Sequence, residues 1–157
     1  MESVEVWMWV IAGLLIGSLM FVAGSTLLAK YLHSQDIGLV RSNFNQLADT
    51  AKKICRLGIY SEETLTLRFP SAASRISVDD KDGVEGEGNE LCLAIKGEDG
   101  KGCLKADTCD VTMNSVVFDE AESSLLQKIS GNTKASVFTF KVTKTGVDAM
   151  QITWKPN

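Results

Sequence analysis

The first 29 residues are almost entirely apolar. Between Val6 and Ala29 the chain has 24 residues and no charged side chain. A helix of that length is about 36 Å long, enough to cross a hydrocarbon layer of about 30 Å. Trp7 and Trp9 lie near one end, and Tyr31 follows the other, as is typical of aromatic side chains at membrane interfaces. The pattern predicts a hydrophobic transmembrane helix over residues 1–29.

A cleaved signal peptide is the alternative for this segment. The flank before it carries Glu2 and Glu5 instead of basic residues, and the apolar run is longer than in a typical signal peptide. Within the run, Gly13 and Gly17 form a GxxxG pattern, which lets a second helix approach closely. We therefore expect a persistent helix that packs against other helices.

Residues 30–58 are amphipathic. Their apolar positions recur at spacings of three and four, which predicts one apolar stripe on a helix: Ile37, Val40, Phe44, Leu47, Ala51 and Ile54. Basic residues in the last turn complement the helix dipole, and Gly58 supplies a stop. We predict one helix over about residues 4–57, with the stripe packed on a partner surface.

Residues 59–157 change to a period of two, which predicts strands. The expected strands cover Thr64–Phe69, Arg75–Asp79, Leu91–Lys96 and Asp110–Phe118, followed by a short helix over Ala121–Ile129. A closing hairpin places Phe138, Phe140 and Val142 on one strand and Met150, Ile152 and Trp154 on the other. The predicted fold class is therefore α+β, with one long N-terminal helix and a C-terminal antiparallel β-sheet packed on its stripe.

All four cysteines follow the apolar segment: Cys55, Cys92, Cys103 and Cys109. An even number in a small domain on a membrane anchor favours two disulfides. A zinc site and reduced buried thiols are the alternatives, although no CxxC pair exists. We expect Cys103 to pair with Cys109 and Cys55 with Cys92.

Carboxylates gather in residues 79–90, where Asp79, Asp80, Asp82 and Glu85 are the candidate calcium ligands. An EF-hand needs Gly at position six and Glu at position twelve. If Gly83 is sixth, Asn89 is twelfth, so the pattern does not match. The sequence favours a solvated loop here, and we predict no metal and no cofactor.

The charges divide into three regions. Residues 1–29 carry −2, residues 30–60 carry +3 and residues 61–157 carry −5, which together make the net charge of −4. The chain has no excess of basic residues, so nucleic-acid binding is not expected. With His33 as the single histidine and no catalytic motif, we predict that the protein is not an enzyme.

The layout resembles that of type IV pilins, and of archaeal pilin-like proteins in particular. The shared features are an amphipathic helix ending in Ile54-Cys55-Arg56-Leu57-Gly58, a Thr/Leu strand ending at Pro70 and an Ile-x-Val strand. The resemblance implies an extracellular filament subunit for adhesion or surface attachment. Copies of the chain would bundle their N-terminal helices into the filament core, after residing in the membrane. The residues that would pack in assembly are Glu5, Gly13, Gly17 and the stripe Ile37, Val40, Phe44, Leu47 and Ile54.

Glu5 matches a family glutamate if Met1 is the first residue of the mature chain. In the family, that carboxylate neutralises the N-terminal amine of a neighbouring subunit, as a buried charge requires. An interfacial acid is the alternative role.

The chain also departs from the family. It lacks the proline kink of many bacterial pilins, no basic leader precedes the apolar run, and Trp7 and Trp9 are bulky for a filament core. The missing leader and the two tryptophans favour the alternative of a membrane-anchored binding or accessory subunit that does not polymerise.

The topology signals conflict. Lys30, His33 and Arg41 follow the span and place the following domain in the cytoplasm, whereas paired cysteines place it outside. A removed basic leader would reconcile them. We expect a single-pass anchor with its β domain on the cell surface.

Overall fold

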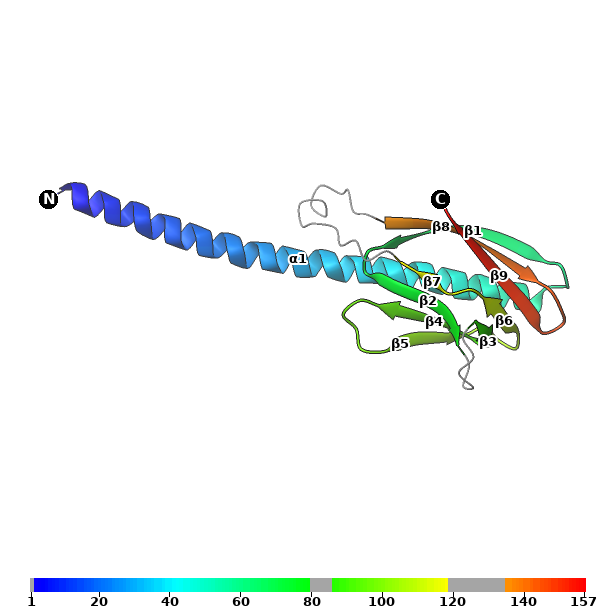
Figure 1. Ribbon diagram of the computed structural model, residues 1–157. Helices are drawn as coiled ribbons and strands as arrows, with labels where there is room; N and C mark the ends of the chain where they lie inside the picture. The colour runs from blue at the N-terminus through cyan, green and yellow to red at the C-terminus, as the bar shows by residue number, and fades with distance from the viewer. Residues whose placement is uncertain (1, 80–85, 119–134) are drawn as a thin grey trace. The chain divides into compact units, whose positions relative to one another are not determined.

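A computed structural model describes residues 2–79, 86–118 and 135–157. The described residues form one helix, α1 (Glu2–Arg56), followed by strands (Figure 1). The strands in the described ranges are β1 (Glu62–Pro70), β2 (Ala73–Asp79), β3 (Glu87–Gly88), β4 (Glu90–Ile95), β5 (Lys101–Lys105), β6 (Asp110–Met113), β7 (Val116–Val117), β8 (Ala135–Lys144) and β9 (Ala149–Pro156). The predicted α+β class with a long N-terminal helix is confirmed, while the helix expected over 121–129 lies outside the described residues.

The chain divides into two compact units, Met1–Gln35 and Asp36–Asn157. The first unit is helical throughout its described part. The second, called the head below, contains the last 21 residues of α1 together with all the described strands. The amphipathic part of the helix is thus folded with the strands.

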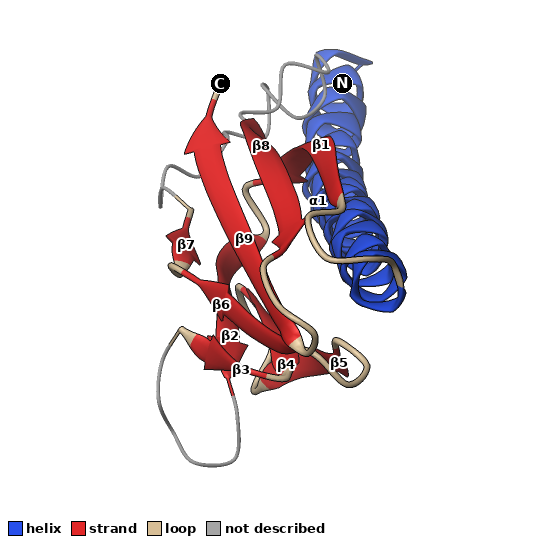
Figure 2. Ribbon diagram, turned by 90° about the vertical axis from the view of Figure 1, so that its right-hand side faces the viewer, coloured by secondary structure: helices blue, strands red, loops and turns tan. Residues whose placement is uncertain are grey.

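Two sheets make up the β part of the head. One has the strand order β1-β8-β9-β6-β3, and the other has the order β5-β4-β2-β7. Figure 2 shows β1, β8 and β9 side by side in the first sheet. The expectation of antiparallel pairing holds for six of the seven strand pairs, whereas β6 and β9 are parallel.

The stretch expected as one strand over Asp110–Phe118 is two strands. It breaks after Met113, and β6 and β7 belong to different sheets. Strand β5 was not predicted, because Lys-Gly-Cys-Leu-Lys offers one strong apolar side chain and a glycine, which weakens the strand pattern.

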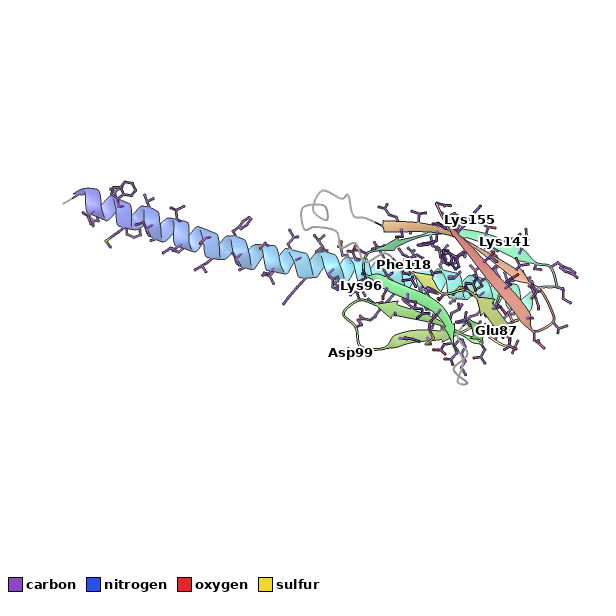
Figure 3. The ribbon with its side chains drawn as sticks, in the orientation of Figure 1. Glu87, Lys96, Asp99, Phe118, Lys141 and Lys155 are labelled. Carbon is purple, nitrogen blue, oxygen red and sulfur yellow. A yellow bond between two sulfur atoms is a disulfide. The ribbon has the colours of Figure 1, made fainter. Side chains whose placement is uncertain are left out.

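The closing hairpin is confirmed. Strands β8 and β9 pair in antiparallel register, with Phe140 opposite Trp154 and Val142 opposite Ile152. The alternation buries one face and leaves Lys141 and Lys155 on the other, where Figure 3 labels them on these two strands. Each strand therefore has one side in the core and one in water.

The helix stripe lies in the core of the head. Five of its side chains are buried there, namely Val40, Phe44, Leu47, Ala51 and Ile54, and Ile37 packs against them. Aromatic rings of β1, of β8 and of Phe118, the residue after β7, join them. Phe69 lies 5.1 Å from Phe118, and Phe118 lies 5.4 Å from Phe138, between ring centroids. The predicted packing of the sheet on the stripe is confirmed. These side chains are consequently covered by the chain's own strands, so the expectation that they form an assembly surface is wrong.

Candidate functional site

The apolar segment, defined here as Val4–Leu28, presents its side chains outward. Its most apolar 18-residue window has a mean hydropathy of 2.2, and none of that window is buried within the protein. Its exposed large side chains include Trp7, Leu14, Leu19 and Phe21. This helix is long and apolar enough to cross a membrane.

Polar side chains within the apolar segment bond to the helix itself. The hydroxyls of Ser18, Ser25 and Thr26 donate to carbonyl oxygens three residues earlier, at distances of 2.8, 2.9 and 2.8 Å. Such internal bonds remove the need for water at these positions. The segment is therefore chemically suited to an apolar environment in spite of its hydroxyls.

Three glycines of the segment leave one helix face open. A Cβ atom added at Gly13, Gly17 or Gly24 would meet no atom within 4 Å. At 3.6 residues per turn, these positions fall within an arc of about 40°. The predicted pair, Gly13 and Gly17, is thus part of a longer glycine face that also includes Gly24. Glu5 is exposed in the same helix, and its expected intermolecular role remains a prediction.

The C-terminal end of α1 is covalently attached to the strands. Cys55 pairs with Cys109, with Cα atoms 5.9 Å apart, and Cys92 pairs with Cys103, with Cα atoms 4.1 Å apart. All four cysteines are disulfide-bonded as expected, but the expected pairing is wrong. The reason is β5, which places Cys103 directly opposite Cys92 in the β4–β5 ladder.

A buried lysine reinforces the same attachment. Lys144, at the end of β8, is 7% exposed, and its ammonium donates to the carbonyl oxygens of Cys55 and Leu57, the latter at 2.9 Å. These carbonyls lie at the helix end, where the backbone lacks partners and the dipole favours a cation. The continued alternation from Phe138, Phe140 and Val142 was the signal that Lys144 faces inward.

Replacing Lys144 with methionine should destabilise the head by about 1–3 kcal/mol, because two carbonyl oxygens at the helix end lose their donor. Chemical unfolding of the full chain in detergent measures the change. Lys141→Met is the matched control. Lys141 is exposed on the opposite face and pairs with Glu62 at 2.7 Å, so it should cost well under 1 kcal/mol. Equal losses in both variants would contradict the capping role.

The acidic stretch does not form a metal site in the described part of the chain. Asp79 pairs with Lys101 at 3.2 Å, while Asp80, Asp82 and Glu85 lie outside the described residues. Among residues 2–79, 86–118 and 135–157, no three His, Cys, Asp or Glu side chains are grouped so as to hold a metal ion.

A small groove lies on the head between α1 and the β4–β5 hairpin. Its volume is about 210 Å³. The groove is lined by the apolar side chains of Phe44, Leu93, Ile95 and Leu104. At its rim, Arg41 donates to both carboxylate oxygens of Glu98, at 2.8 and 2.9 Å.

Comparisons with known proteins identify no relative. The chain matches no protein-family model, no curated protein and no solved structure. Two features of the chain itself bear on its function: the uncovered apolar segment and the head attached to its helix.

Proposed function

We propose that this protein is the structural subunit of an extracellular, type IV pilus-like filament that serves adhesion or surface attachment. One observation carries the proposal. A single helix has one part in the core of a disulfide-linked head and another part whose apolar side chains are uncovered. Exposed apolar area of this extent requires apolar surroundings. Lipid supplies them before assembly, and the same segments of neighbouring copies supply them in a filament.

The glycine face explains how copies would pack. Between helices in apolar surroundings, association depends on close van der Waals contact, which small residues permit. Gly13, Gly17 and Gly24 offer that approach. Glu5 is the only charged residue in 4–29. In a helix bundle its carboxylate needs a cationic partner, and the amino terminus of a neighbouring copy would fit if Met1 begins the mature chain.

The attachment of the helix end to the strands suits a subunit that must withstand mechanical tension. Tension on the helix would be transmitted to the sheets by the Cys55–Cys109 disulfide, by the hydrogen bonds of Lys144 and by the packing of the helix in the core. Disulfides persist in oxidising compartments, so the two bonds support a head outside the cell. The copies of the chain are its proposed partners.

The test is a pair of double variants in the apolar segment. Gly13→Leu/Gly17→Leu blocks the close approach of helices, and we expect at least a tenfold loss of filaments in sheared surface material examined by electron microscopy. The amount of membrane-bound chain should not fall, because leucine is more apolar than glycine. Ala12→Leu/Ile16→Leu is the control, with the same spacing on a face rotated by about 100°. Sheared material without filaments in the unaltered strain would refute the proposal.

A second candidate is a membrane-anchored accessory subunit that stays unpolymerised. Trp7 and Trp9, 67% and 75% exposed, favour it, because indole rings suit a membrane interface better than a crowded helix bundle. In that case the chain would be recovered only in discrete detergent-extracted complexes, and never in sheared filaments.

A further inference from the structure

The two disulfides of the head differ in accessibility. Cys55 and Cys109 are 5% and 0% exposed, so the bond between them lies inside the core. In the other bond, Cys92 is 1% exposed, whereas Cys103 is an exposed residue. One of the two bonds therefore ends in a cysteine that solvent reaches.

Cys103 is exposed because of the position of its strand. β5 lies at the edge of its sheet and, among the described strands, pairs with β4 alone (Figure 1). Four of the five residues of β5 are exposed, and the remaining one, Leu104, is half-buried. A reagent in water can therefore approach the strand from the side that faces away from β4.

The register of the strands directs such an approach to one of the two sulfur atoms. Cys103 stands directly opposite Cys92, so the disulfide runs across the ladder from β4 to the edge strand. A thiolate attacks a disulfide in line with the S–S bond, from the side opposite the leaving sulfur. At Cys103 that side is the edge of the sheet. At Cys92 it is β2, where the opposite residue, Ser77, is 5% exposed.

The charged side chains beside the Cys92–Cys103 bond balance one another. Lys101 donates to Asp79 at 3.2 Å, and Lys105 stands opposite Glu90 in the β4–β5 ladder. Residues 61–157 as a whole carry −5, and a negative charge disfavours the approach of a thiolate. The two opposite pairs cancel, so these four side chains add no net repulsion at the bond.

The Cys55–Cys109 bond is protected by the core of the head. Ile54, beside Cys55, is 1% exposed, and Val111, near Cys109, is 0% exposed. The ammonium of Lys144 donates to the carbonyl oxygen of Cys55. A thiolate reaches this bond only when the end of α1 separates from the strands, so exchange there requires local unfolding.

Reduction of the Cys92–Cys103 bond leaves other contacts of the head in place. β4 and β5 still pair through their backbones, from Glu90 opposite Lys105 to Ala94 opposite Lys101. The second disulfide still attaches the helix end to the strands. The reduced form therefore presents two neighbouring thiols on a folded head, and the pairing of the strands keeps them in position for reoxidation.

We propose that Cys92–Cys103 is a thiol–disulfide exchange site, which a dithiol reduces while Cys55–Cys109 stays intact. One thiolate of the dithiol forms a bond to Sγ of Cys103, and Sγ of Cys92 leaves with the electron pair and takes up a proton. The second thiolate attacks the reductant sulfur bound to Cys103, whose Sγ leaves in the same way. The protein disulfide thus gains two electrons and two protons, and the dithiol is oxidised to a disulfide.

This inference goes beyond the proposed function and concerns the head alone, so it does not depend on whether copies of the chain assemble. The full chain in detergent is incubated with dithiothreitol, quenched with iodoacetamide at successive times, digested and analysed by mass spectrometry. We expect Cys92 and Cys103 to be alkylated faster than Cys55 and Cys109 by about tenfold or more. Equal rates, or faster alkylation of Cys55 and Cys109, would overturn the proposal.

The same reaction in guanidinium chloride is the control. Because the fold produces the difference in access, the two bonds should be reduced at similar rates in the unfolded chain. A preference that persists unchanged in denaturant would show that local sequence produces it, which contradicts the argument from the edge strand.

A monothiol identifies the sulfur that is attacked. Glutathione at early times should form a mixed disulfide with Cys103 and leave Cys92 as a free thiol, which iodoacetamide then alkylates. The two products differ in which peptide carries the glutathione, so mass spectrometry separates them. Glutathione found first on Cys92 would refute the assignment of Cys103 as the point of attack.

Discussion

Replacing both Cys55 and Cys109 with alanine should lower the free energy of unfolding of the head by about 4 kcal/mol. The bond joins residues 54 apart in the chain, and a crosslink over so long a loop greatly restricts the unfolded state. The loss exceeds a quarter of the 5–15 kcal/mol that is typical of folded domains. Denaturant unfolding of the full chain in detergent, followed by near-ultraviolet circular dichroism, measures it.

The second disulfide supplies the matched comparison. Cys92 and Cys103 are 11 residues apart, so the double alanine variant should lose about 3 kcal/mol by the same argument. It should also leave the helix end attached, whereas the first variant should open the region around Cys55 to proteases. A larger loss from the Cys92–Cys103 variant would contradict the central role assigned to the helix attachment.

Leu47→Ala should destabilise the head by about 3–5 kcal/mol, because it removes a fully buried side chain and leaves a cavity between α1 and the strands. Leu39 provides a control of the same residue type in the same helix. Its side chain is 56% exposed, so Leu39→Ala should change the free energy of unfolding by less than about 0.5 kcal/mol.

Both variants are measured by unfolding of the full chain in detergent, with the extent of membrane binding as a second reading. Neither substitution touches the apolar segment, so membrane binding should be unchanged in both. Similar losses for the two leucines would mean that the stripe is not the part of the helix that enters the core.

Local patterns predicted the elements that depend on local spacing. The apolar stripe from Ile37 to Ile54 was found from the helical period, because neighbouring turns place these side chains on one face whatever they contact. The β8–β9 hairpin was found in the same way, since its two alternating strands adjoin a short turn. The end of α1 at Arg56 likewise agrees with the expected stop at Gly58.

Elements that depend on distant partners were missed or misread. Strand β5 has a weak pattern of its own and exists as part of a ladder with β4. Because β5 was not predicted, nothing in the sequence indicated that Cys92 and Cys103 lie opposite each other on neighbouring strands. Both disulfides were therefore assigned wrongly. The burial of Lys144 was not predicted, because a charged side chain is expected in water, and only the carbonyl oxygens of Cys55 and Leu57 make its burial favourable.

The sequence alone determined that this protein has an apolar helix, an amphipathic continuation and a β-rich remainder. It also determined that the continuation is net positive and the remainder net negative. These properties follow from the composition and period of contiguous residues, and no tertiary contact is needed to read them. The tertiary structure decided which cysteines pair, that the stripe lies in the head's own core, and that Lys144 is buried against the carbonyl oxygens of Cys55 and Leu57. These contacts depend on which strands become neighbours. Strand pairing is determined by the packing of the whole core, so it cannot be read from any single segment of the sequence.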